Sequence, residues 1–132
     1  MEIKTTPVPK PRMTFRDRWG GKSKRPIVER YHNYLDTLRD AFQKNHFTMG
    51  NSLIIIFLMP MAESWSKKKK LQFDGRVHQN KPDLDNLIKA VCELHEKDQE
   101  IFSVVAQKFW ATEGSVIIIN NDTEAIPTWQ TH

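Results

Sequence analysis

The chain has 132 residues, of which 27% are charged and 39% hydrophobic, a balance that is typical of a folded domain and excludes a disordered chain. The formal net charge is +4 and is uneven: residues 1–30 carry nine Lys/Arg and three Asp/Glu, whereas residues 109–132 carry three acids and no Lys or Arg. A basic segment on a nearly neutral body favours a polyanionic partner without proving one.

The single cysteine, Cys92, is too few for an intrachain disulfide or a structural zinc site, and we expect an inert thiol on the buried side of a helix. A reducing, cytoplasmic location is therefore expected. The N-terminus is polar and basic, which predicts no signal peptide, and the longest apolar run, LIIIFLMPMA, is too short to span a bilayer. We expect one domain over residues 1–132.

The N-terminal segment, residues 1–25, is expected to be basic and to consist of extended pieces and loops. Residues 7–26 contain four prolines, two glycines and seven Lys/Arg. Proline removes a backbone donor and glycine loosens the chain, so regular structure is disfavoured here. The pattern then becomes helical and predicts an amphipathic helix over about residues 26–45, with the apolar stripe Ile27, Tyr31, Tyr34, Leu35, Leu38, Ala41 and Phe42.

The middle of the chain predicts a strand followed by a polar excursion. Residues 52–59, SLIIIFLM, are continuously apolar and rich in β-branched side chains, which predicts a strand buried on both faces. Residues 63–78 are polar and include four consecutive lysines, which favours a short helix or a mobile excursion. A turn at Asp74-Gly75 is expected to end it.

A second helix is expected to begin after Asp83, with an apolar stripe from Leu84 to Leu94 or His95. Residues 101–110 and 115–120 read as two strands joined by a turn at Glu113-Gly114, a pattern that predicts a hairpin. Residues 121–132 are expected to form a flexible tail. Together these elements favour an α+β fold, a small mixed sheet with two main helices packed on it.

The stretch 80–102, NKPDLDNLIKAVCELHEKDQEIF, gathers acids around the second predicted helix. The simplest interpretation is structural: Asp83 caps the helix, while Asp85 and Glu93 each pair with Lys89. A D-x-D pair is common by chance, so spacing alone favours this interpretation. The alternative is that the carboxylates hold Mg²⁺, that Lys89 neutralises charge on a phosphate, and that the basic segments hold a nucleic-acid backbone.

The segment KPDLDNLIKAVCEL closely resembles the core motif of the RusA-like Holliday junction resolvases, which are common in phages and prophages. Four further segments resemble the family in the same order: PVPKPRMTFRDRW, MPMAESWSKKKK with GRVHQNKPD, KDQEI, and VVAQKFWATEG. The resemblance runs from about residue 7 to 119. Five motifs in order are far more specific than D-x-D alone.

The resemblance implies a homodimeric, Mg²⁺-dependent endodeoxyribonuclease, with Mn²⁺ able to substitute, that cuts four-way DNA junctions in recombination and repair in a bacterial cell or phage-infected host. It implies catalytic roles for Asp83, Asp85, Lys89 and Asp98, with the three aspartates as metal ligands. The family often has two adjacent acids where this chain has Lys97-Asp98, and aspartate where it has Glu93. Rivals of Asp98 are Glu96 and Glu100.

Asp85 and Asp98 pose a geometric problem, because they are 13 residues apart. A helix running through that interval would separate them by about 20 Å, too far for the ligands of one metal ion. Either the helix stops early and the chain doubles back, or Asp98 completes the site of another subunit. The short HEK segment favours the second arrangement, so we expect active sites shared across a dimer.

Other side chains are candidates for DNA contact, with a solvated surface as the alternative for the basic ones: Lys10, Arg12, Arg16, Arg18, Arg25, Lys67, Lys68, Lys69, Lys70, Lys108 and His78. A lone histidine is more often structural. Phe15 or Trp19 could stack at the junction centre, whereas Trp65 and Trp110 are expected to pack.

Two other functions stay open. One is a non-catalytic phage DNA-binding or replication-accessory protein on the same fold. The other is a toxin-type RNase, which the matched motif disfavours.

Overall fold

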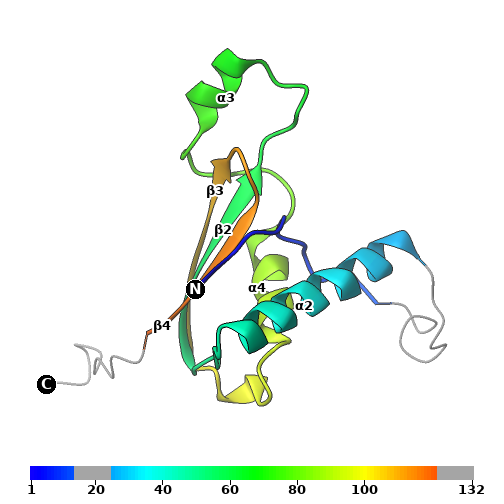
Figure 1. The fold of residues 1–132 in the computed structure, drawn as a ribbon, viewed down its shortest axis with the longest axis vertical. Coiled ribbons are helices and arrows are strands. Elements are labelled where there is room, and N and C mark those ends of the chain that lie inside the picture. The colour runs from blue at the N-terminus through cyan, green and yellow to red at the C-terminus, as the bar shows by residue number, and fades with distance from the viewer. Residues whose placement is uncertain (14–24, 122–132) are drawn as a thin grey trace, which may run out of the picture.

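The computed structural model describes residues 1–13 and 25–121 (Figure 1). Four residues with predicted DNA contacts lie outside the described residues: Phe15, Arg16, Arg18 and Trp19. Residues 122–132 of the expected tail lie outside them as well. No helix in the described ranges is both long and apolar enough to cross a membrane.

A four-stranded mixed sheet forms one layer of the molecule, with the strand order β1-β4-β2-β3. The strands are β1 (Glu2–Ile3), β2 (Ser52–Pro60), β3 (Ser103–Ala111) and β4 (Ser115–Asn120). β2 pairs in parallel with β3 and antiparallel with β4, and β4 pairs antiparallel with β1. The mixed sheet confirms the expected fold class, whereas β1 is a paired strand in a segment that the sequence predicted only as extended pieces and loops.

The predicted hairpin of the last two strands is wrong, because β2 lies between β3 and β4. β2 is the most continuously apolar strand, and a central place satisfies the backbone hydrogen-bonding groups along both of its edges. Residues 112–114 link β3 to β4 past the end of β2 and press against the N-terminal segment. A Cβ on Gly114 would lie 2.7 Å from the Cα of Thr6, so the close approach requires glycine.

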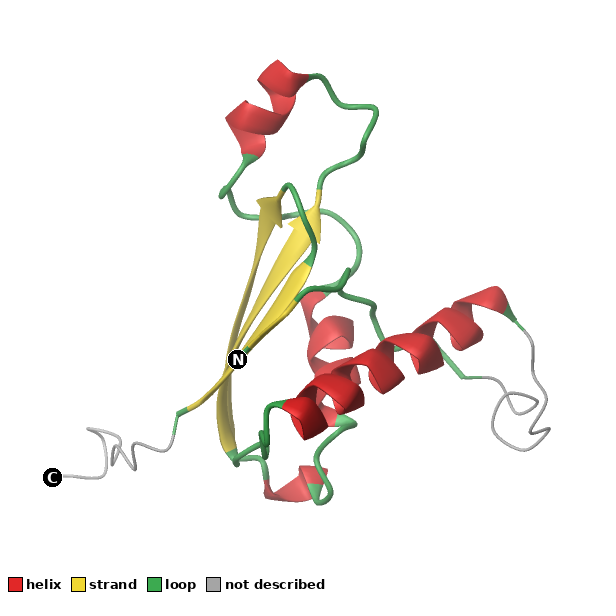
Figure 2. Cartoon of the chain, in the orientation of Figure 1, coloured by secondary structure: helices red, strands yellow, loops and turns green. Residues whose placement is uncertain are grey.

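Two helices cover one face of this sheet, α2 (Pro26–Lys44) and α4 (Leu84–Cys92), as Figure 2 shows. The sequence predicted α2 to within one residue, although Val28 is buried in place of Ile27, which is 42% exposed. The short helix α3 (Lys67–Phe73) stands apart from this layer, and a 3-10 turn, η1 (Asp98–Glu100), precedes β3. The excursion at residues 63–78 is therefore the short helix of the two alternatives.

The two faces of β2 differ in burial, because successive side chains of a strand alternate between faces. Leu53, Ile55, Phe57 and Met59 are buried beneath the helices, whereas the residues between them are only half-buried. The prediction of burial on both faces is therefore wrong for the second face. We call that second face the open face, and the register assigns it Glu2, Ile54, Ile56, Leu58, Val105, Gln107, Phe109, Ser115, Ile117 and Ile119.

Candidate active site

Asp83 is the N-cap residue of α4, but its carboxylate does not cap the helix. Its backbone is extended, and its carbonyl oxygen accepts the Leu87 N–H at 3.3 Å. The side chain makes no capping hydrogen bond; instead Lys81 Nζ donates to Asp83 Oδ1 at 2.8 Å. The capping role predicted for this carboxylate is therefore wrong, and the group, half exposed, faces solvent and a cation.

Asp85 lies in the first turn of the same helix, and Lys89 follows one turn later. Lys89 Nζ lies 3.9 Å from Asp85 Oδ2, which confirms the predicted i,i+4 pair. That distance is too long for a hydrogen bond, so charge alone holds the pair and either group can turn to another partner. Glu93 does not complete the predicted trio, because it binds Lys10 Nζ at 2.6 Å.

The charges around Asp83 keep its carboxylate ionised. The hydrogen bond from Lys81 and the positive charge of that side chain lower the pKa of Asp83, and the charge of Lys108 acts in the same direction. In return, the hydrogen bond to Asp83 raises the pKa of Lys81. Asp83 therefore presents the deprotonated form, which is the form that binds a metal cation.

The loop that leads into Asp83 is held by β3, the edge strand of the sheet. Lys108 Nζ donates to the carbonyl oxygens of Asn80 and Pro82 at 2.5 and 2.6 Å, and the Lys108 carbonyl oxygen accepts the His78 N–H at 3.0 Å. Burial lowers the pKa of Lys108. Its ammonium group is thus engaged by the loop, and we revise the expected phosphate contact to a positioning role.

The helix α4 ends at Cys92, so the continuous helix that gave the separation of about 20 Å does not exist. Tight turns follow, in which the Leu94 and His95 N–H groups donate to the carbonyl oxygens three residues earlier. His95 fixes the reversal: its Nδ1 accepts the Lys97 N–H at 2.9 Å, and its Nε2 lies 2.8 Å from Asn51 Oδ1. The short HEK segment is therefore long enough for the chain to turn back.

The reversal does not bring Asp98 to the other two aspartates. Asp98 begins η1 beyond the C-terminal end of α4, whereas Asp83 and Asp85 lie at its N-terminal end. The nine residues of α4 span about 13 Å. Within residues 1–13 and 25–121, no group of three or more His, Cys, Asp or Glu side chains is placed to hold a metal ion. One chain therefore gathers Asp83, Asp85, Lys81 and Lys89, but not Asp98.

Two ionisable carboxylates nevertheless suit Mg²⁺, which is commonly held by one or two carboxylates together with waters and phosphate oxygens. Asp83 and Asp85 are both largely exposed and supply oxygen donors of the right type. Cys92, by contrast, is half-buried at the far end of the helix, where burial and then the charge of Asp98 raise the pKa of its thiol. A raised pKa favours the protonated thiol, which is the less nucleophilic form, so an inert Cys92 stays our prediction.

The basic side chains expected to contact DNA have different surroundings. Lys10 is engaged by Glu93, and its N–H donates to the Asn86 carbonyl oxygen at 2.9 Å, so it ties the N-terminal segment to α4. Arg12 is exposed, and its carbonyl oxygen accepts from Arg25 at 3.1 Å. The four lysines of α3 are consecutive and thus point in different directions, about 100° apart around the axis.

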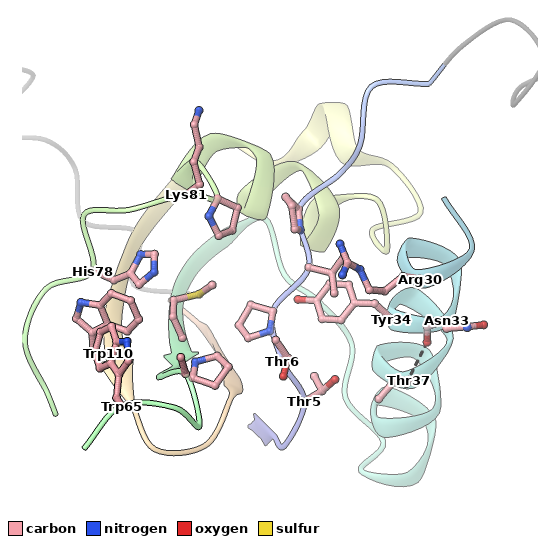
Figure 3. Close-up of a pocket in the computed structure, with 17 residues that line it drawn as sticks. Thr5, Thr6, Arg30, Asn33, Tyr34, Thr37, Trp65, His78, Lys81 and Trp110 are labelled. Carbon is pink, nitrogen blue, oxygen red and sulfur yellow. Dashed lines mark hydrogen bonds between the residues drawn. The ribbon is translucent and has the colours of Figure 1, made fainter. Parts of the chain in front are cut away.

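A pocket of about 820 Å³ lies beside the loop that leads into Asp83, and Lys81 of that loop lines it (Figure 3). One side consists of three rings that we call the aromatic wall: Trp65, His78 and Trp110. The ring centroids of the two tryptophans are 5.0 Å apart, and those of His78 and Trp110 are 4.3 Å apart. The opposite side comes from residues 5–9 and from α2. Trp65 and Trp110 do pack, as expected, and they also line a cavity that the sequence did not reveal.

His78 is 5% exposed, which places it in the pocket wall rather than on an open phosphate-binding surface. Burial and then the charge of Lys108 lower its pKa, so the ring is neutral at pH 7. Its Nδ1 atom is buried and has no hydrogen-bond partner among the described residues. No sequence pattern signals this pocket, because its residues come from five separate stretches of the chain.

Comparison with known families gave a match. A family model described as endodeoxyribonuclease RusA matches residues 4–120. The chain belongs to the RusA family. RusA proteins are Holliday junction nucleases that act on branched DNA in recombination. Searches of curated proteins and of solved structures gave no significant match. The family match concerns the chain as a whole, so the roles of single side chains are inferred from their geometry.

Proposed function

We propose that this RusA protein resolves four-way DNA junctions by Mg²⁺-dependent hydrolysis of phosphodiester bonds, with Asp83 and Asp85 as metal ligands. The observation that carries the proposal is the pair of exposed carboxylates at the start of α4, flanked by Lys81 and Lys89. Carboxylates that only capped the helix would bind its first N–H groups, and Asp83 does not.

Each side chain of the site has a distinct task. A Mg²⁺ ion bound to the two aspartates would neutralise charge on the scissile phosphate and activate a water molecule. Asp83 is kept ionised by Lys81, whose exposed ammonium group can turn to a phosphate oxygen when DNA arrives. Lys89, held only loosely by Asp85, can approach the phosphate and stabilise the charge that develops during hydrolysis.

We further propose that the protein acts as a homodimer in which Asp98 of one subunit completes the acidic site of the other. The support is the separation within one chain, where α4 stands between Asp98 and the two other aspartates. A two-fold axis that sets the N-terminal end of one α4 beside the η1 turn of its partner would unite them. The same symmetry suits a four-way junction, which has two equivalent strands to cut.

A substrate panel tests the function directly. Labelled four-way junction, duplex DNA, single-stranded DNA and RNA are each incubated with the protein in Mg²⁺, in Mn²⁺ and in EDTA. We expect nicks in the junction alone, and only with a divalent metal. Tight junction binding without cleavage in either metal would instead show a non-catalytic DNA-binding protein, and cleavage of RNA alone would show a ribonuclease.

A further inference from the structure

We propose that the pocket beside the loop that leads into Asp83 receives a nucleobase that leaves the base stack next to the scissile phosphate. The inference rests on the proposed function, because it assigns to the same site a means of recognising the base at the cut. Its ligand class is a single unstacked base of DNA, held by ring stacking and by a hydrogen bond to its edge.

The size and lining of the pocket suit a base. Pockets that hold small ligands are mostly apolar and have volumes of roughly 300–1,000 Å³, and this one is about 820 Å³. Trp65 and Trp110 are half-buried and offer ring surface to the cavity. Stacking of a base on such a ring is favourable and can offset the cost of taking the base out of the stack.

His78 supplies the polar contact that a stacking pocket needs for selection. A neutral imidazole has one ring nitrogen that donates a hydrogen bond and one that accepts. The buried Nδ1 atom has no hydrogen-bond partner among the described residues, which costs the folded protein free energy. Because His78 lines the pocket, a rotation of its ring on binding would let a ring nitrogen contact the edge of a base.

The position of the pocket links it to the acidic pair. Lys81 and Pro82 line the pocket. Asp83 follows directly in the chain, so its Cα lies about 3.8 Å from the Cα of Pro82. A base seated in the pocket would therefore carry its own phosphate toward Asp83. Arg30 and Lys81 lie at the pocket, and their positive charges suit the sugar-phosphate backbone of that nucleotide.

The pocket is already formed without DNA, since both of its sides are anchored. The N-terminal side is held by hydrogen bonds from the Ile118 N–H to Met1 and from the Lys10 N–H to Asn86. The aromatic side is held by the Trp110 N–H donating to the Arg76 carbonyl oxygen at 2.8 Å and by the backbone bond between His78 and Lys108. A base thus enters a prepared cavity, which limits the entropy lost on binding.

The test is a scan of weakened base pairs in EDTA, where binding is measured without cleavage. A mismatch is moved step by step across the crossover of a four-way junction, because a mismatched base is easier to unstack. Three proteins are compared: the unsubstituted chain, Ala62→Phe, which fills the pocket from an exposed position, and Ser64→Phe, a control on the same loop that does not line the pocket.

We expect one mismatch position beside the cut to tighten binding by about tenfold in the unsubstituted chain and in Ser64→Phe, but not in Ala62→Phe. A 5-iodouracil at that position should crosslink under ultraviolet light to Trp65 or Trp110. A flat scan, or an equal gain in all three proteins, overturns the inference while junction cleavage stands. If the unsubstituted chain showed no preference for the junction in EDTA and no cleavage once Mg²⁺ was added, the proposed function itself would be overturned.

Discussion

Lys108 Nζ donates a 2.6 Å hydrogen bond to the carbonyl oxygen of Pro82, the residue immediately before Asp83. A strand residue thereby fixes the start of the helix that carries both acids. The same ammonium group also binds the Asn80 carbonyl oxygen. The site therefore depends on the edge strand β3 as well as on α4. A substitution of Lys108 tests this dependence without changing either aspartate.

Lys108→Met should misplace the loop and leave two carbonyl oxygens without their donor. We expect the single-turnover cleavage rate to fall by about tenfold or more, because small displacements of catalytic groups are costly, while junction affinity changes little. The free energy of unfolding should fall by about 1–3 kcal/mol. Lys44→Met, on an exposed part of α2, is the matched control and should change neither quantity. If Lys108→Met instead weakened junction binding and left the single-turnover cleavage rate normal, Lys108 would be a phosphate-binding residue.

Lys89 should act on the transition state rather than on substrate binding. Its pair with Asp85 is loose, so the ammonium group is available to a phosphate one turn along the helix. Lys89→Ala should lower the single-turnover rate by about 10²-fold and leave the dissociation constant for the junction nearly unchanged. Weaker junction binding with a normal single-turnover rate would contradict this role. Lys44→Ala is the control for the loss of one positive charge.

The lysines of α3 should bind DNA backbone, although not all at once. They point around the helix, and Lys69 Nζ lies 3.9 Å above the Trp65 ring. Replacing all four with Ala should flatten the log–log dependence of binding on salt by about two units, fewer than four, at roughly one unit for each lost phosphate contact. An unchanged slope would mean that this helix is only a solvated surface.

Mixed dimers test whether the site is shared. Asp85→Asn and Asp98→Asn homodimers should each be inactive. After the two are unfolded and refolded together, a shared arrangement gives each mixed dimer one site with both lesions and one site with neither. Nicking of one strand should then return, while paired symmetric cutting stays impaired.

If nicking does not return although mixed dimers are present, Asp98 acts in its own chain or outside the site. The open face then offers the other way to pair, since most of its side chains are apolar, with Val105 53% and Ile119 42% exposed, and its polar groups Glu2, Gln107 and Ser115 are few. Sheets stacked through that face would leave the two α4 helices on the outer sides, too far apart for a shared site.

The sequence predicted those features that depend on local pattern. The three- and four-residue spacing of apolar side chains located α2, and the motif around Asp83 and Asp85 located α4 and the acidic pair. It failed where contacts between distant segments decide. A short turn after β3 suggests a hairpin, but the need of β2 for partners on both edges places it between β3 and β4.

The same limit applies around the site. The carboxylate of Asp83 lies at the start of a helix, which predicts that it caps the helix. In the structure the carboxylate accepts a hydrogen bond from Lys81 instead. Lys108 and the aromatic wall come from separate stretches, and only the folded chain sets them beside the acids. The sequence also indicated too little room for the chain to double back before Asp98, because nothing in its spacing shows that His95 can fold the chain back.

Cleavage of a four-way junction by Asp83→Asn and Asp85→Asn proteins in Mg²⁺ tests the central claim most directly. The amide removes an anionic metal ligand and also removes repulsion toward phosphate, so we expect no cleavage with junction affinity kept or improved. Asp40→Asn, a change at an exposed position of α2, should cut as the unsubstituted chain does. Full activity in the Asp83→Asn protein would contradict the account.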